Sequence, residues 1–274
     1  MIFWQNYYNE VLVEQAQRYG VDPALLKGQM LQESNGALDP GDYCQINGQM
    51  QYCGNNGATG LMQITADALG DVLGNAPEAL LEQIVELYNY TGGPNPGVSP
   101  RLPVKRDNQT YKDYYLSLGK DSAEYKALSE LALRFIDGRC FAAEAAAGLC
   151  VEGEIQPDEG KIAIQLAAAI NDYNRTFLRA KVPNWEAISR SEQEKIVLAA
   201  YNGGVNGIGN AVLAAQERYG AQVTWEQVKE MLMTGRATYT LNWCQAAIYP
   251  DNILCYARSK EDCNIQMVTG ECAP

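Results

Sequence analysis

The chain contains no histidine among its 274 residues. This absence excludes catalysis by Ser-His-Asp or Cys-His arrangements, and it excludes any zinc site built on imidazole ligands. No two cysteines stand in a CxxC arrangement, which argues against zinc ribbons and thioredoxin-like redox motifs. Several common classes of catalytic centre are therefore ruled out before any motif is considered.

Long apolar runs and basic surface are also missing. No run of 18 apolar residues occurs, so we expect no membrane-spanning helix. The first residues, 1–6, lack the basic start and small-residue cleavage site of a signal peptide, so either a signal has been removed or export uses another route. The 21 basic and 33 acidic residues leave a net charge of −12, which argues against nucleic-acid binding and indicates an acidic, solvated surface.

Strand signals are scarce, and the apolar residues follow a helical period almost throughout, which predicts an all-α fold. The length suffices for one large domain or two small ones. We expect no regular structure over the Gly- and Pro-rich residues 91–120, a polar loop over 35–57 and little periodicity after 237. Helices are expected in a first segment with Tyr8, Leu12, Ala16 and Tyr19 on one face, and over 22–33, 66–73, 77–90, 121–135, 158–180, 191–201, 208–219 and 224–234.

Capping signals place several helix starts. Asp22 is suited to the N-cap of its helix and Pro23 to the first helical position. Pairs of a short polar residue and an acid or amide three positions later resemble capping boxes. Three such pairs occur: Asp121 with Glu124, Ser191 with Glu194, and Thr224 with Gln227.

The cysteines fall into close pairs along the chain. Disulfides within these pairs would each stabilise the fold by roughly 2–3 kcal/mol and would indicate an oxidising compartment. Eight cysteines allow 105 pairings, so alternatives stay open, above all within 244–272; buried free thiols in a cytosolic protein are the other reading. The simplest pairing is Cys44–Cys53, Cys140–Cys150, Cys244–Cys255 and Cys263–Cys272.

Glu33 stands where a carboxylate is unexpected. Leu26, Met30 and Glu33 fall at i, i+4 and i+7 and share one face of the expected helix, so an acid continues an apolar row. Glu33 also lies in the last turn, where the helix dipole disfavours negative charge. Both effects favour a raised pKa, and a carboxyl that stays protonated near neutral pH can act as a general acid.

Three short strings occur in a characteristic order: Gln32-Glu33-Ser34, Gly57-Ala-Thr-Gly-Leu-Met-Gln-Ile64 and Ala199-Ala-Tyr-Asn-Gly-Gly204. Together they resemble the lytic transglycosylases of the soluble Slt type, in the goose-type-lysozyme-like superfamily. The preceding Tyr19-Gly-Val-Asp-Pro-Ala-Leu-Leu26 is similar to the family's approach to its catalytic helix. The resemblance covers roughly residues 19–66 and 158–240, about half of the chain.

The resemblance implies a single lysozyme-like α-domain over 1–274, with an insertion at about 72–157 and a cysteine-rich tail at about 237–274. It implies cleavage of the β-1,4 bond between N-acetylmuramic acid and N-acetylglucosamine in a peptidoglycan strand, with a 1,6-anhydro product. Glu33 would be the catalytic acid and then the base. No metal and no cofactor are implied, and the location would be secreted, periplasmic or in the cell envelope.

Further site residues follow from the same strings. Met62 would place its thioether against a sugar face or be a plain core residue, and Gln63 would offer an amide to the sugar or merely cap a helix. Tyr201 would hydrogen-bond the Glu33 carboxyl or the sugar, or would be a plain core residue. Asn202 beside it would line the site or cap its helix. Ser34 would orient Glu33 or simply end the helix. Tyr239, in Arg236-Ala-Thr-Tyr239, matches a closing family element only in part.

The chain departs from the family where Asn35-Gly36 replace an aromatic residue and Asn, and in the insertion, which could shape the groove or bind a protein partner. Two other functions therefore stay open. A hydrolytic muramidase or chitinase-like enzyme would need a second carboxylate, for which Asp39, Asp42 and Asp67 are nearby in sequence. A structural part of a secretion, conjugation or phage assembly would need no catalysis.

Overall fold

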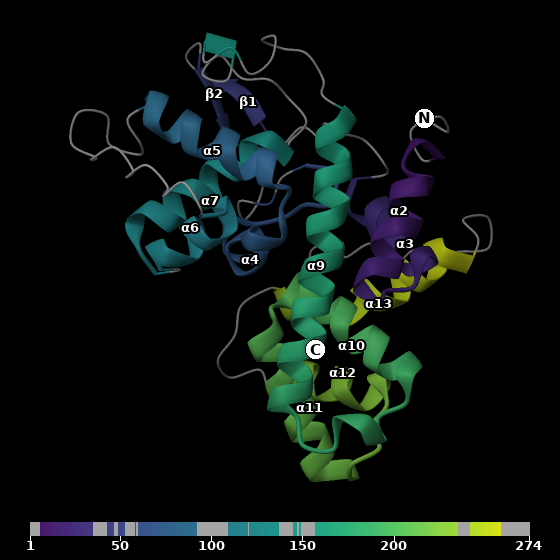
Figure 1. The fold of residues 1–274 in the computed structure, drawn as a ribbon. Helices are drawn as coiled ribbons and strands as arrows, with labels where there is room; N and C mark the ends of the chain where they lie inside the picture. Colours follow the sequence, from purple (N-terminus) through teal and green to yellow (C-terminus); the bar gives the residue numbers. More distant parts are fainter. Residues whose placement is uncertain are drawn as a thin grey trace. The chain divides into compact units, whose positions relative to one another are not determined.

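The computed structural model is mostly helical, which confirms the all-α prediction (Figure 1). Within the parts of the chain that it describes, no helix is long and apolar enough to cross a membrane. The described residues are 6–34, 43–46, 49–52, 58, 60–91, 109–119, 121–136, 145–146, 148, 157–234 and 242–258.

The chain divides into two compact units. The first comprises residues 1–18 and 33–170, and the second comprises residues 19–32 and 171–274. The boundaries fall inside α3 (Pro23–Ser34) and α9 (Pro157–Lys181), and just before the last residue of α2 (Asn9–Tyr19). The single domain over 1–274 with an insertion at 72–157 stays a prediction.

The first unit contains a cluster of short helices that pack on one another. Helix α7 packs on α4, α5 and α6, and α6 also packs on η2 and α5 (Figure 1). Thr65 caps the start of α4 by accepting a hydrogen bond from the Ala68 N–H at 3.3 Å. The elements of this unit are α2 (Asn9–Tyr19), β1 (Tyr43–Ile46), β2 (Gln49–Tyr52), α4 (Ala66–Val72), η2 (Leu73–Asn75), α5 (Glu78–Thr91), α6 (Tyr111–Leu118), α7 (Ala123–Ile136) and the first part of α9.

Helix α6 corrects the expectation that residues 91–120 lack regular structure. The prolines and glycines that prompted it lie at 92–108, outside the described residues. Thr110 caps α6 by accepting a hydrogen bond from the Asp113 N–H at 3.0 Å, and the helix buries Tyr114 and Tyr115. The composition of the preceding segment therefore obscured a short helix that tertiary burial stabilises.

The hairpin of β1 and β2 is a second feature that the sequence reading missed within its polar loop. The strands pair antiparallel with Tyr43 opposite Tyr52 and Ile46 opposite Gln49, and Cys44 lies in β1. The two residues between the strands, Asn47-Gly48, are the dipeptide most typical of two-residue hairpins. That signal was present in the sequence and could have predicted the hairpin.

Three buried tyrosines hold the helices of the first unit together. The Tyr115 hydroxyl donates to the Leu81 carbonyl at 3.1 Å, and the Tyr125 hydroxyl donates to the Gly70 carbonyl at 2.6 Å. The rings of Tyr114 and Tyr115, and of Tyr115 and Tyr125, meet edge to face. Burial raises the pKa of Tyr114 and of Tyr125 to about 12 and also raises that of Tyr115, because the phenolate is poorly solvated there.

We expect this unit to lose stability as the pH rises from about 10 toward about 12. In that range tyrosines of the unfolded chain release protons that the folded protein retains, so the free energy of unfolding falls by about 1.4 kcal/mol per pH unit for each such tyrosine. Urea unfolding at successive pH values, followed by circular dichroism, measures the slope.

Tyr125→Phe is the control for this loss of stability at high pH. The variant lacks one titrating hydroxyl and its bond to Gly70, so it should be less stable at neutral pH but show a shallower slope above pH 10. An unchanged slope would show that Tyr125 does not contribute.

The second unit has a core of apolar side chains from α9, η3, α10, α11, α12 and α13, in which Trp185 and Trp225 are the largest. Helix α10 packs on α11, α12 and α13, and α12 packs on α11 and α13. Besides most of α3 and the second part of α9, the unit consists of η3 (Trp185–Ala187), α10 (Arg190–Gly203), α11 (Val205–Tyr219), α12 (Trp225–Thr234) and α13 (Asn242–Arg258).

The predicted capping boxes have different outcomes. Thr224 and Gln227 form a reciprocal box at the start of α12: the Gln227 carbonyl Oε1 accepts from the Thr224 N–H at 2.9 Å, and Thr224 Oγ1 accepts from the Gln227 N–H at 3.4 Å. The Ser191 box is wrong, because Ser189 occupies the N-cap of α10. The Asp121 box is wrong by one position, since Ser122 accepts from the Tyr125 N–H.

Helix α13 was missed because its apolar residues do not follow one stripe. It contains Pro250 in its interior, a residue that normally interrupts a helix. Its Tyr249 and Ile253 form a small core with Leu25 of α3 and Leu198 of α10. Contact with two other helices therefore stabilises a segment whose local pattern is weak.

The predicted bridge between Cys244 and Cys255 is wrong. Both cysteines are disulfide-bonded, but they lie in the same helix, α13. Eleven helical positions separate them by about 16 Å, whereas disulfide-linked Cα atoms lie about 4.4–6.8 Å apart. Cys53, Cys140, Cys150, Cys263 and Cys272 lie outside the described residues.

Candidate active site

Glu33 lies in the last turn of α3, as predicted, and its side chain is partly exposed. Helix α3 begins at Pro23, because Asp22 Oδ1 accepts a hydrogen bond from the Ala24 N–H at 2.7 Å and proline suits the first helical position. Leu26 and Met30, on the same face as Glu33, are fully buried. The carboxyl thus stands at the accessible end of an otherwise buried row.

The core of the second unit brings α3 into close contact with α13. A Cβ atom at Gly28 would lie 2.6 Å from the Ile253 carbonyl oxygen, nearer than real Cβ contacts occur. Glycine therefore permits the two helices to approach at this point. The path of α3, which ends in Glu33 and Ser34, is set by this close packing.

The second string forms a tight turn with a strained residue. The Gln63 N–H donates to the Gly60 carbonyl at 3.1 Å, and the Gln63 side-chain Nε2 donates to the same carbonyl at 3.1 Å. Gly60 has φ +72° and Gln63 has φ +46°. A left-handed backbone is uncommon for a residue other than glycine, and such strain concentrates at functional sites. The side chain of Gln63 is partly exposed, as a sugar-binding amide must be.

Met62 corrects one expectation for this turn. Its side chain is fully buried, as are those of Leu61 and Ile64, so its thioether is part of the apolar core and does not line a groove. Ser34, at the end of α3, is also buried, with 8% of its surface exposed. Neither side chain offers the open surface that direct contact with a glycan requires.

The third string ends helix α10. The helix stops at Gly203, and the N–H of Gly204, which has φ +82°, donates to the Ala200 carbonyl at 2.9 Å, so the two glycines end the helix. The Tyr201 ring stacks on Tyr249 of α13, with centroids 6.5 Å apart and planes at 4°. Asn202 Oδ1 is buried and accepts no hydrogen bond from the described part of the chain.

Tyr249 is a residue that the sequence reading missed in this region. It belongs to α13, which was not predicted. Its ring stacks on the ring of Tyr201, the side chain that is predicted to contact Glu33 or the sugar. The spacing of Tyr249 and Ile253, one helical turn apart on one face, is the signal that could have indicated it.

The predicted site residues are divided between the two units. Glu33, Ser34, Met62 and Gln63 belong to the first, and Tyr201 and Asn202 belong to the second. Their meeting in one site stays a prediction. Tyr239 and the possible second carboxylates Asp39 and Asp42 lie outside the described residues, while Asp67 is exposed in the first turn of α4.

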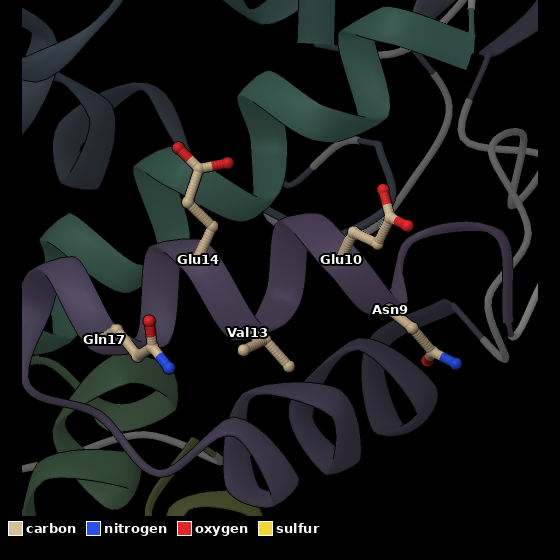
Figure 2. Close-up of a pocket in the computed structure, with 5 residues that line it drawn as sticks. All are labelled: Asn9, Glu10, Val13, Glu14 and Gln17. Carbon is tan, nitrogen blue, oxygen red and sulfur yellow. The ribbon is translucent and has the colours of Figure 1, made fainter.

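A shallow, open pocket of about 440 Å³ lies elsewhere, on the outer face of α2. Figure 2 shows its lining as two rows of side chains along the helix, Glu10 and Glu14 in one row and Asn9, Val13 and Gln17 in the other. None of the predicted site residues lines it. Among the described residues, no group of three or more Cys, Asp or Glu side chains is arranged to hold a metal ion.

Comparison of the chain with models of protein families, with curated proteins and with solved structures finds no match in any of the three. The resemblance to lytic transglycosylases therefore depends on the three strings and their order along the chain. The structure shows an all-α fold, and the lysozyme-like details that the resemblance implies stay a prediction.

Proposed function

We propose that the protein is a peptidoglycan lytic transglycosylase in which Glu33 is the catalytic residue. The observation that carries this proposal is the position of Glu33: a partly exposed carboxyl that ends a row of fully buried apolar side chains on α3. The strained Gln63 in the turn of the second string supports it, because its backbone conformation costs energy that a purely structural turn does not require.

The chemistry needs one carboxyl that changes role. Glu33 first donates its proton to the glycosidic oxygen between N-acetylmuramic acid and N-acetylglucosamine, and the bond to C1 breaks. The resulting carboxylate then accepts the proton of the muramic acid 6-hydroxyl, whose oxygen bonds to C1 and closes the 1,6-anhydro ring. A second protein carboxylate is unnecessary because the nucleophile belongs to the substrate, whereas a hydrolase commonly uses two.

The partner in this proposal is the glycan strand, and the location is an oxidising one outside the cytoplasm or in the cell envelope. The disulfide-bonded Cys244 and Cys255 support such a compartment.

The helices α5, α6 and α7 within the proposed insertion pack together around buried tyrosines, which supports a folded element that could receive a protein partner.

Product analysis tests the proposal. The protein is incubated with purified peptidoglycan, and the released fragments are analysed by mass spectrometry. We expect muropeptides that end in 1,6-anhydro-muramic acid and are lighter by one water than hydrolysis products, because the sugar hydroxyl attacks C1.

Fragments with a reducing end would instead establish a hydrolase, for which Asp67 is a described candidate for the second carboxylate. Absence of any released fragment, under conditions where a known muramidase digests the same preparation, would exclude cleavage and favour a structural role in an envelope assembly.

A further inference from the structure

We propose that Gln29 and Asn171 are positioning residues for the Glu33 carboxyl: a buried amide pair that sets the orientation of α3. This inference rests on the proposed function of Glu33. It concerns how the chain holds the acid in place, and none of the three sequence strings includes either amide.

The pair joins two helices across the second unit. Asn171 Nδ2, on α9, donates to Gln29 Oε1, on α3, at 2.8 Å, and the two residues are 142 positions apart in the chain. Their exposed fractions are 2% and 0%. A hydrogen bond between buried amides is directional, so it specifies one rotation of α3 about its axis, which packing of apolar side chains alone defines less sharply.

Helix α3 links the orientation of Gln29 to that of Glu33. Gln29 and Glu33 are one turn apart on the same face of α3, and the helix is continuous from Pro23 to Ser34. Because the backbone between them is hydrogen-bonded at every residue, a rotation or shift at Gln29 displaces the Glu33 carboxyl with it.

Two further contacts hold the same helix. On α13, the Ile253 carbonyl oxygen lies so close to Gly28 that the helix cannot move toward it. On α9, Arg175 Nη1 donates to the Tyr19 carbonyl at 3.1 Å, just before α3 begins. The Gln29–Asn171 bond lies between this anchor and Glu33, one helical turn before the acid.

The energetics agree with a positioning role better than with a purely stabilising one. Gln29 Nε2 and Asn171 Oδ1 are buried and have no partner in the described part of the chain. A buried amide that is only half satisfied contributes little net stability, and an apolar pair of similar volume can stabilise equally well. An apolar pair would lack the directional Gln29–Asn171 hydrogen bond, and with it the contact that specifies the rotation of α3.

Three variants test the inference: Gln29→Leu, Asn171→Leu and the double variant. The matched control is Asn174→Leu, which makes the same substitution at a buried asparagine one turn along α9 that has no described bond to α3. For each protein, kcat, KM and the pH dependence of kcat are measured on peptidoglycan fragments, with circular dichroism and urea unfolding as checks of folding.

We expect each single variant to lower kcat by roughly 10- to 100-fold with KM little changed, since small misplacements of a catalytic group have effects of this size. The double variant should be no slower than the slower single one, because both substitutions remove the same bond. The acidic limb of the pH profile should move in all three and stay in place in Asn174→Leu.

Two outcomes would overturn the inference and are distinguishable from failure of the proposed function. If wild-type protein cleaves and Gln29→Leu and Asn171→Leu cleave at the wild-type rate, the positioning role is wrong while the function stands. If Asn174→Leu loses kcat to the same extent, the amides act through general stability alone. If wild-type protein releases no fragments, the function and the inference fall together.

Discussion

Replacing Glu33 by glutamine is expected to reduce peptidoglycan cleavage by about 10³-fold or more. General acid–base catalysis by one group contributes roughly 10²- to 10⁴-fold, and in the proposed mechanism one carboxyl serves both as the acid and as the base. The glutamine side chain has nearly the same shape but its amide neither protonates a glycosidic oxygen nor accepts the proton of a sugar hydroxyl. The rate of release of anhydro-muropeptides measures the effect.

The same substitution should leave the fold intact. Glu33 is partly exposed at the end of α3, so Glu33→Gln is expected to change the free energy of unfolding by no more than about 0.5 kcal/mol. Glu14→Gln is the matched control, since it neutralises an exposed glutamate on α2 and should retain full activity. If Glu33→Gln cleaves at the wild-type rate, Glu33 is not the catalytic residue and the assignment fails.

Gly28→Ala is expected to destabilise the second unit by about 1–3 kcal/mol. The added Cβ would lie 2.6 Å from the Ile253 carbonyl oxygen and 3.2 Å from its Cγ2, so α3 and α13 must separate to admit it. The oxygen belongs to the backbone and cannot rotate aside as a flexible side chain would. This loss should exceed the gain of about 1 kcal/mol that alanine normally brings to a helix interior. Urea unfolding measures the difference.

Gly70→Ala provides the comparison for that prediction. Gly70 is also inside a helix, α4, but a Cβ there would meet Ser129 Oγ at 3.6 Å and Tyr125 Cε1 at 3.7 Å, which are ordinary contacts. This variant should be neutral or more stable by about 0.5–1 kcal/mol. If both variants are stabilised equally, the close approach of α3 and α13 is not a constraint.

Several helices could be predicted from the sequence because their signals are local. Asp22 and Pro23 start α3, the reciprocal bonds of Thr224 and Gln227 start α12, and Gly203-Gly204 end α10. Each signal depends on residues within a few positions of one another, so the local sequence is sufficient to predict where these helices begin or end. The start of α10, two residues earlier than predicted, shows what local sequence leaves undecided: Ser189 and Ser191 are equally suitable N-caps by residue type.

The elements that were missed depend on partners distant in the sequence. Helix α6 buries Tyr115 against α5, and α13 packs Tyr249 and Ile253 against α3 and α10. The predicted Cys244–Cys255 bridge failed for a related reason: the two cysteines are close in sequence, but the helix between them holds them apart. Secondary structure that forms only on burial leaves a weak local pattern.

For the candidate site, the sequence by itself determined which residues carry the proposal: it contains no histidine, it places a carboxylate at the end of an apolar helical row, and it contains the three strings in order. Tertiary structure alone decided that Met62 is buried, that Gln63 has a strained backbone and that Gly28 and Gln29 hold α3 against α13 and α9. Residue types and spacing are encoded locally, whereas burial and the Gln29–Asn171 bond arise only when residues 142 positions apart come together.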